Sequence, residues 1–109
     1  MANLREWLNE QEFDWDKGKI VYQYYEEDPT HFPGWGSPDK AKIIVKSEPV
    51  LDYEFDSGFG GANAPRIIAM DNVAIYIIGQ YDGSTWMEKI YKDIDVYANM
   101  EAEVPYIGG

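Results

Sequence analysis

A chain of 109 residues, of which 45% are hydrophobic and 16% aromatic, has enough apolar surface for one folded domain with a single core. Its formal net charge of −11 repels nucleic acid and anionic membranes and favours a basic partner. Cysteine is absent, which excludes disulfides and thiolate metal sites. No membrane-span pattern or signal-peptide layout is visible, so we expect a soluble, cytoplasmic protein with no membrane partner.

The negative charge comes from three separate blocks of sequence. Residues 1–28 carry 8 acids and 3 bases, residues 50–72 carry 4 acids and 1 base, and residues 73–109 carry 6 acids and 2 bases. Residues 29–49 carry 2 acids and 3 bases. Because the acids are spread along the chain, we expect them to lie on the surface of the folded domain, where charged residues are ordinarily solvated.

The first elements are a helix and a strand. Asn3 followed by Glu6 has the layout of a capping box, and apolar residues at helical spacing predict a helix over about residues 4–11. The apolar and aromatic run of residues 19–25 predicts a strand, with Tyr22 and Tyr24 on one face. We expect one of the two tyrosine rows of this strand to be half exposed.

A long loop and a lysine-rich strand follow. Residues 26–39 hold three of the six prolines, so they predict a loop that offers Phe32 and Trp35 beside His31, the chain's one histidine. These aromatic residues either bind a ligand or fold back as a lid on the core. Residues 40–46 alternate lysine with apolar residues, which is typical of a strand at the edge of a sheet.

Residues 49–56 alternate so regularly that they predict another strand. In this interpretation Leu51, Tyr53 and Phe55 point inward, while three carboxylates share the outer face at a spacing of about 6.5 to 7 Å. The row admits three interpretations: a solvated surface, a mimic of successive phosphates along a nucleic-acid strand, or a metal site. Side chains that stand in a row converge poorly on one ion. The three carboxylates are Asp52, Glu54 and Asp56.

Residues 66–91 contain the most hydrophobic part of the chain. Asp82-Gly83 is a strong hairpin signal, and it predicts an antiparallel meander of residues 66–70, 73–81 and 84–91. Residues 73–81 carry no charge, which is typical of a strand covered on both faces. Residues 92–100 predict a short helix capped at Asp93, with Ile94, Tyr97 and Met100 inward.

These elements predict a single α+β domain over residues 1–109. We expect a mainly antiparallel sheet of about five to six strands, a short N-terminal helix and a short C-terminal helix. We expect no cofactor, because two-His and Cys–His metal sites are impossible within one chain and no phosphate-binding motif is complete.

In size and composition the chain resembles small phage-encoded inhibitors of host defence, such as anti-CRISPR and anti-restriction DNA mimics, and equally resembles immunity proteins that neutralise nucleases. The resemblance implies a non-enzymatic viral or immunity protein that blocks a basic, nucleic-acid-binding enzyme by protein–protein contact and does not bind nucleic acid itself. The residues expected to contact the partner are Asp52, Glu54, Asp56, Glu26, Glu27, Asp28, Phe32 and Trp35.

Two alternatives remain open at the level of sequence. One is a recognition module for a glycan or a peptide that uses the aromatic loop with Tyr22, Tyr24 and Trp86, because aromatic faces supply rigid contact area. The other is a metal-dependent phosphoesterase that uses Asp71 together with the carboxylates of residues 52–56. The scarcity of arginine counts against this enzyme, because phosphoryl chemistry requires cationic groups around the developing charge.

Overall fold

The protein folds as a five-stranded antiparallel sheet with a short helix at each end of the chain, which confirms the predicted α+β class. The computed structural model describes residues 1–28, 37–58, 64–81 and 83–105. The strand order is β2-β1-β3-β4-β5, and all neighbouring strands are antiparallel. The elements are α1 (Leu4–Glu10), β1 (Lys19–Tyr24), β2 (Lys40–Ile44), the 3-10 helix η1 (Pro49–Asp52), β3 (Arg66–Met70), β4 (Ala74–Tyr81), β5 (Ser84–Tyr91) and α2 (Asp95–Ala98).

The predicted meander is present as β3, β4 and β5, and its bounds differ from the prediction by one residue. β4 and β5 pair along their whole length from Ala74↔Tyr91 to Tyr81↔Ser84. Gly83 in the connecting turn has a φ of 82°, a conformation that costs glycine little and other residues much. The local turn chemistry therefore sets the register of this hairpin.

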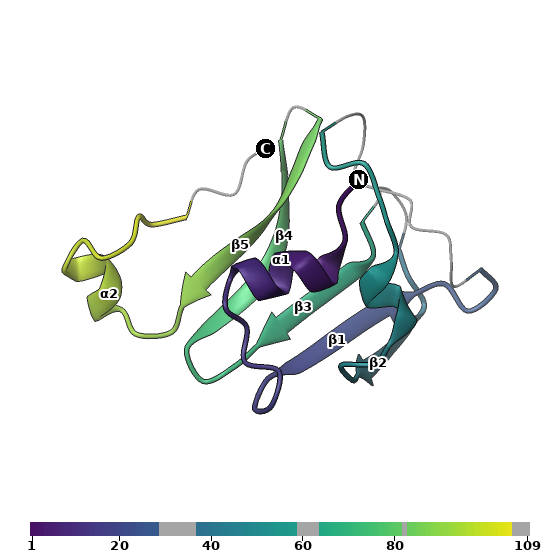
Figure 1. Cartoon of the computed structure of the whole chain (residues 1–109), viewed down its shortest axis with the longest axis horizontal. Coiled ribbons are helices and arrows are strands. Elements are labelled where there is room, and N and C mark those ends of the chain that lie inside the picture. The colour runs from purple at the N-terminus through teal and green to yellow at the C-terminus, as the bar shows by residue number, and fades with distance from the viewer. Residues whose placement is uncertain (29–36, 59–63, 82, 106–109) are drawn as a thin grey trace.

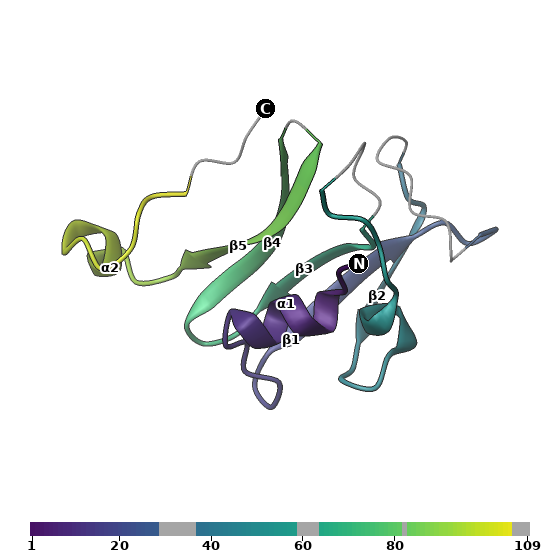
Figure 2. The same cartoon turned by 45° about the horizontal axis from the view of Figure 1, so that its top comes forward.

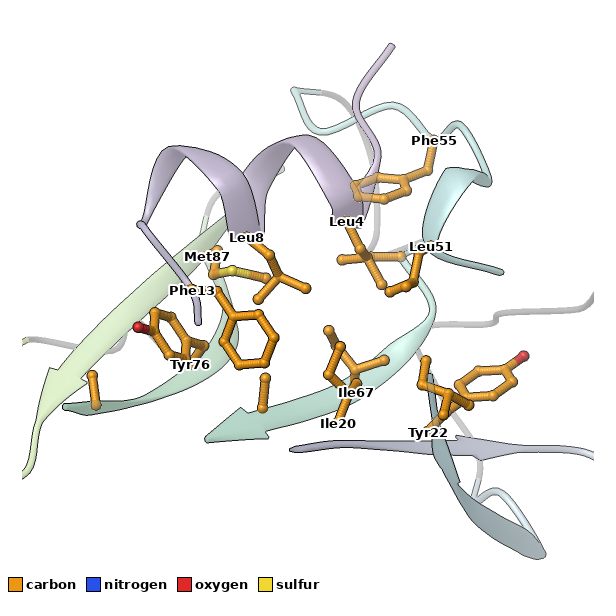
Figure 3. Packing of buried hydrophobic residues seen from close by; sticks show 14 residues of the cluster. Leu4, Leu8, Phe13, Ile20, Tyr22, Leu51, Phe55, Ile67, Tyr76 and Met87 are labelled. Atoms are coloured by element: carbon orange, nitrogen blue, oxygen red, sulfur yellow. The ribbon is translucent and has the colours of Figure 1, made fainter. Parts of the chain in front are cut away.

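Helix α1 packs against one face of the sheet. The side chain of Asn3 caps its first turn by accepting a hydrogen bond from the Glu6 N–H at 2.9 Å. Figure 3 shows Leu4 and Leu8 pointing from α1 toward the strand residues Ile20 and Ile67. Both leucines are fully buried, and each contributes about 1.5 to 3 kcal/mol through removal of apolar surface from water. The predicted amphipathic helix is confirmed.

β2 lies at one edge of the sheet, as its lysines predicted. It ends at Ile44, so Lys46 falls beyond the strand. Lys40 and Lys42 are exposed, and each lies within 4 Å of a carboxylate, at 3.5 Å from Glu26 and 3.7 Å from Glu48 respectively. Charged side chains along an edge strand disfavour pairing with another chain.

The C-terminal helix is shorter than predicted, and its Tyr97 side chain contacts β5. The Asp93 side chain accepts a hydrogen bond from the Asp95 N–H, and the Tyr97 hydroxyl accepts one from the Tyr91 N–H at 2.8 Å. Ile94 and Met100, which were predicted to point inward, are exposed, because α2 lies beyond the end of β5 and not over the sheet (Figures 1 and 2). In the part of the chain that the structure describes, no helix is both long and apolar enough to cross a membrane.

The two faces of the sheet have different surroundings. In both views α1 and η1 lie on the same side of the sheet (Figures 1 and 2), and the strand residues on that side, such as Tyr76 and Ala69, are buried. On the other side, Ile68 and Met70 of β3 are exposed and Ile75 of β4 is half-buried. On β4 itself, predicted to be covered on both faces, Ile75 and Ile77 are half-buried and Gly79 is buried under the Trp86 ring, although α1 and η1 lie on the other side.

Candidate functional site

The strand predicted over residues 49–56 is not formed. Pro49 begins the 3-10 helix η1, in which local turns replace a strand ladder: the Tyr53 N–H donates to the Val50 carbonyl at 3.2 Å. Phe55 then forms an isolated bridge with Ala2, with hydrogen bonds of 2.8 and 2.9 Å in the two directions. Leu51 and Phe55 are buried as predicted, but Tyr53 is exposed, because this segment does not have the strict two-residue period of a strand.

Asp52 contacts α1 through an ion pair. The Arg5 guanidinium donates two hydrogen bonds to the Asp52 carboxylate, at 2.6 and 3.1 Å. The hydrogen bond from Arg5 holds the pKa of Asp52 below its usual range, and the same bond raises the pKa of Arg5. Asp52 was predicted to contact a partner, but in the structure it joins α1 to η1.

Exposed acidic residues lie on two adjoining segments, α1 and residues 53–57. The edge of the Trp7 ring packs on Phe55 with the ring centroids 5.1 Å apart, so residues 53–57 run alongside α1. Glu54 and Asp56 are exposed on this segment, and Glu6 and Glu10 are exposed on the helix. We call these four residues the helix-side acidic surface. The sequence could not place Glu6 and Glu10 here, because they are more than 40 residues from Glu54 along the chain.

The other predicted acidic residues lie on a different element. Glu26, Glu27 and Asp28 follow the end of β1 and are exposed. The Glu26 N–H donates to the Asp39 carboxylate at 2.9 Å, and the Glu26 carboxylate pairs with Lys40. This group therefore sits where β1 and β2 meet. Phe32 and Trp35, together with His31, lie outside the described residues.

A cavity of about 270 Å³ opens beside the helix-side acidic surface. Glu10 is the acidic residue of its lining, and none of the described lining residues is basic. Gln11, one of the lining residues, joins the end of α1 to β5. Its side-chain amide donates to the Met87 carbonyl at 3.4 Å, and its backbone carbonyl accepts from Lys89 at 2.7 Å. The lining residues are Trp7, Glu10, Gln11, Ser57, Thr85, Trp86 and Met87.

One polar atom in the lining of this cavity has no partner within the chain. The hydroxyl of Thr85 is buried and forms no hydrogen bond among the residues that the structure describes. The Thr85 N–H, by contrast, donates to the Ser57 carbonyl at 2.6 Å, which ties residues 53–57 to β5. The lining therefore combines one acidic residue, Glu10, with two tryptophans, Trp7 and Trp86, and these are features that suit a cationic side chain.

Asp71, a candidate metal ligand at the level of sequence, has a structural role. Its buried carboxylate accepts hydrogen bonds from the Tyr76 hydroxyl and from the backbone N–H groups of Asp14, Val73 and Ala74, at 2.7 to 3.0 Å. Burial by itself raises the pKa of Asp71, but the four hydrogen bonds outweigh it and lower that pKa to about 2. Within the described ranges, no three His, Cys, Asp or Glu side chains are grouped to hold a metal ion.

The aromatic residues of the recognition alternative are engaged in packing where they are described. Tyr22, expected as an exposed platform, is buried, and its ring stacks on half-buried Tyr24 with the centroids 5.2 Å apart. Trp86 packs over Gly79 and donates to the Glu88 carboxylate at 2.8 Å. The tyrosines of β1 lie on the face that α1 covers, and this explains their burial.

Comparison of the chain with protein-family models, with curated proteins and with solved structures finds no match.

Proposed function

We propose that the protein is a non-enzymatic acidic inhibitor that occupies the basic, nucleic-acid-binding surface of a partner enzyme in the cytoplasm. The observation that supports this most strongly is the juxtaposition of Glu6 and Glu10 with Glu54 and Asp56 on adjoining segments. The base nearest to them in these segments, Arg5, is already paired with Asp52. Carboxylates gathered in this way attract a basic surface at long range and speed its association.

The cavity supplies a defined contact within this acidic surface. An arginine or lysine side chain of the partner enters between Trp7 and β5, where its charge meets Glu10 and its stem covers apolar surface. A basic enzyme that handles DNA or RNA, such as a defence nuclease, carries such side chains on its nucleic-acid-binding surface. Glu27 and Asp28 extend the negative field at the end of β1.

The proposal is tested by capture from lysate with a salt-gradient elution, using two variants of equal charge. Glu10→Lys with Glu54→Lys changes the helix-side acidic surface, and Glu101→Lys with Glu103→Lys makes the same change in net charge in the exposed C-terminal segment. We expect the unmodified protein and the C-terminal variant to retain a basic nucleic-acid-binding enzyme that elutes as salt rises. The helix-side variant should lose it.

Three results would contradict the proposal. Equal loss in both variants would mean that net charge alone drives capture, and retention by both would remove the helix-side surface as the site. A partner that resists high salt would point to apolar contacts instead. For a captured enzyme, the proposal also requires that the purified inhibitor displace labelled nucleic acid from it, and that the helix-side variant fail to do so.

A further inference from the structure

The face of the sheet opposite α1 presents two rows of aliphatic side chains. The register places Ile43, Val21 and Ile68 side by side across β2, β1 and β3. The next row runs from Met70 through Ile75 to Ile90 across β3, β4 and β5. We call these six residues the open apolar face. Side chains alternate between the faces of a sheet, so all six point away from the buried core.

Three residues of this face are exposed, and the other three, Val21, Ile75 and Ile90, are half-buried. Ile43 is 64% exposed, Ile68 is 48% exposed and Met70 is 45% exposed. By contrast, their neighbours on the opposite face, Ile44 and Ile67, are at most 9% exposed under α1 and η1. Isolated exposed aliphatic residues are ordinary, but contiguous rows across five strands mark an interaction surface.

The charge on this face differs from that of the rest of the chain. The charged strand residues that share the face are Lys19, Arg66 and Glu88, two bases and one acid, whereas the chain carries 20 acids and 9 bases. A basic partner therefore finds no negative field here. Nucleic acid, for its part, is repelled by the net charge of −11.

The occupant that matches this face best is a second copy of the chain. Two-fold symmetry places the same apolar rows on both sides of the interface. It also leaves the helix-side acidic surfaces of the two copies facing outward, away from each other. We propose that the protein forms a two-fold dimer in which the two open apolar faces pack together as a sandwich of two sheets.

The size of the face is sufficient for such a dimer. Five strands about 4.8 Å apart, each contributing about five residues of 3.3 Å, give a flat footprint of roughly 400 Å². Two such footprints sum to about 800 Å², and side-chain relief brings the buried area to the order of 1,000 Å², where specific interfaces begin.

The test is sedimentation equilibrium from micromolar to near-millimolar protein at low and high salt. We expect the mass to rise from one chain to two, and the dimer to strengthen at high salt, since salt screens repulsion between two acidic chains. Ile68→Glu places a charge at the centre of the face and should weaken dimerisation at least tenfold. The matched control Ile94→Glu alters a residue that is 74% exposed in the segment before α2 and should dimerise normally.

A monomer at every concentration, or equal dimerisation of both variants, overturns the proposal, as does a dimer that weakens at high salt. Circular dichroism establishes that each variant is folded. If Ile68→Glu does not fold, Ile43→Glu on the edge strand takes its place, because Ile43 is even more exposed. Failure of dimerisation leaves the binding of a basic partner unaffected, so the two proposals are decided separately.

Discussion

The Tyr76 hydroxyl donates a hydrogen bond of 2.7 Å to the Asp71 carboxylate inside the protein. The same carboxylate accepts from the Asp14 N–H, so one side chain connects the turn between β3 and β4 with the segment between α1 and β1. Asp71 thereby fixes the position of α1 over the sheet. The helix-side acidic surface and its cavity depend on that position.

Asp71 should make the free energy of unfolding depend on pH in the acid range. Its pKa of about 2 in the folded protein lies below the ordinary value of 3.8, so its stabilising contribution is present above pH 4 and is lost as pH falls toward 2. This pKa shift corresponds to a contribution of about 2 kcal/mol to the free energy of unfolding. Asp71→Asn should lower the free energy of unfolding by about 2 to 3 kcal/mol at neutral pH, measured by urea denaturation, and flatten the acid dependence. Tyr76→Phe removes one of the four hydrogen bonds and should cost only about 1 kcal/mol. An unchanged acid dependence in Asp71→Asn would assign the effect to other carboxylates.

The Tyr22 hydroxyl should lose its proton at a higher pH than an ordinary tyrosine does. Burial, with smaller contributions from Glu48 and Tyr24, raises its pKa to about 12, and the pKa of Tyr76 is raised as well. A raised pKa means that the stabilising contribution is present below pH 10 and is lost as pH rises toward 12. Ultraviolet absorbance of tyrosinate should therefore show that Tyr22 and Tyr76 ionise late. Tyr22→Phe should remove one of these two late ionisations, and titration of all tyrosines near pH 10 would show that Tyr22 is accessible to solvent.

Gly79 makes room for the ring of Trp86. A Cβ atom at this position would lie 2.8 Å from two carbons of that ring, so Gly79→Ala must displace the indole and break its hydrogen bond to Glu88. We expect a loss of about 1 to 3 kcal/mol in the free energy of unfolding and a change in tryptophan fluorescence. In a Trp86→Leu background the same substitution should cost much less. Equal costs in both backgrounds would show that the ring is not the obstacle.

The hydroxyl of Tyr97 should hold α2 against β5. Tyr97→Phe leaves the Tyr91 N–H without this acceptor, so hydrogen exchange at the Tyr91 amide should accelerate while the amides of β3 remain protected. Global stability should fall by about 1 kcal/mol or less. Ile94→Ala, which changes a neighbouring exposed side chain, should leave that amide protected. Unaltered protection in Tyr97→Phe would mean that ring packing alone holds the helix.

Patterns within short segments predicted most of the fold. Asn3 with the spacing of Leu4 and Leu8 predicted α1, and the turn at Gly83 predicted the β4–β5 hairpin, because caps, turns and periodicity act over a few residues. The same reason explains why the strand predicted over residues 49–56 is wrong. Its alternation satisfies the period of a strand, but no neighbouring strand pairs with it beyond the single bridge at Phe55.

The sequence by itself determined an acidic α+β domain with an antiparallel sheet and a lysine-bearing edge strand, since composition and local pattern carry that information. Only the tertiary structure decided which acidic residues lie on adjoining segments. Arg5 pairs with Asp52 across 47 residues, which joins η1 to α1, whereas Glu26 lies at the end of β1 and pairs with Lys40. The tertiary structure also decided that α1 and η1 lie on one face of the sheet. The buried leucines of α1 attach this helix to that face, and η1 contacts α1. Among the described residues, α1 and η1 therefore leave Ile43, Ile68 and Met70 on the opposite face exposed.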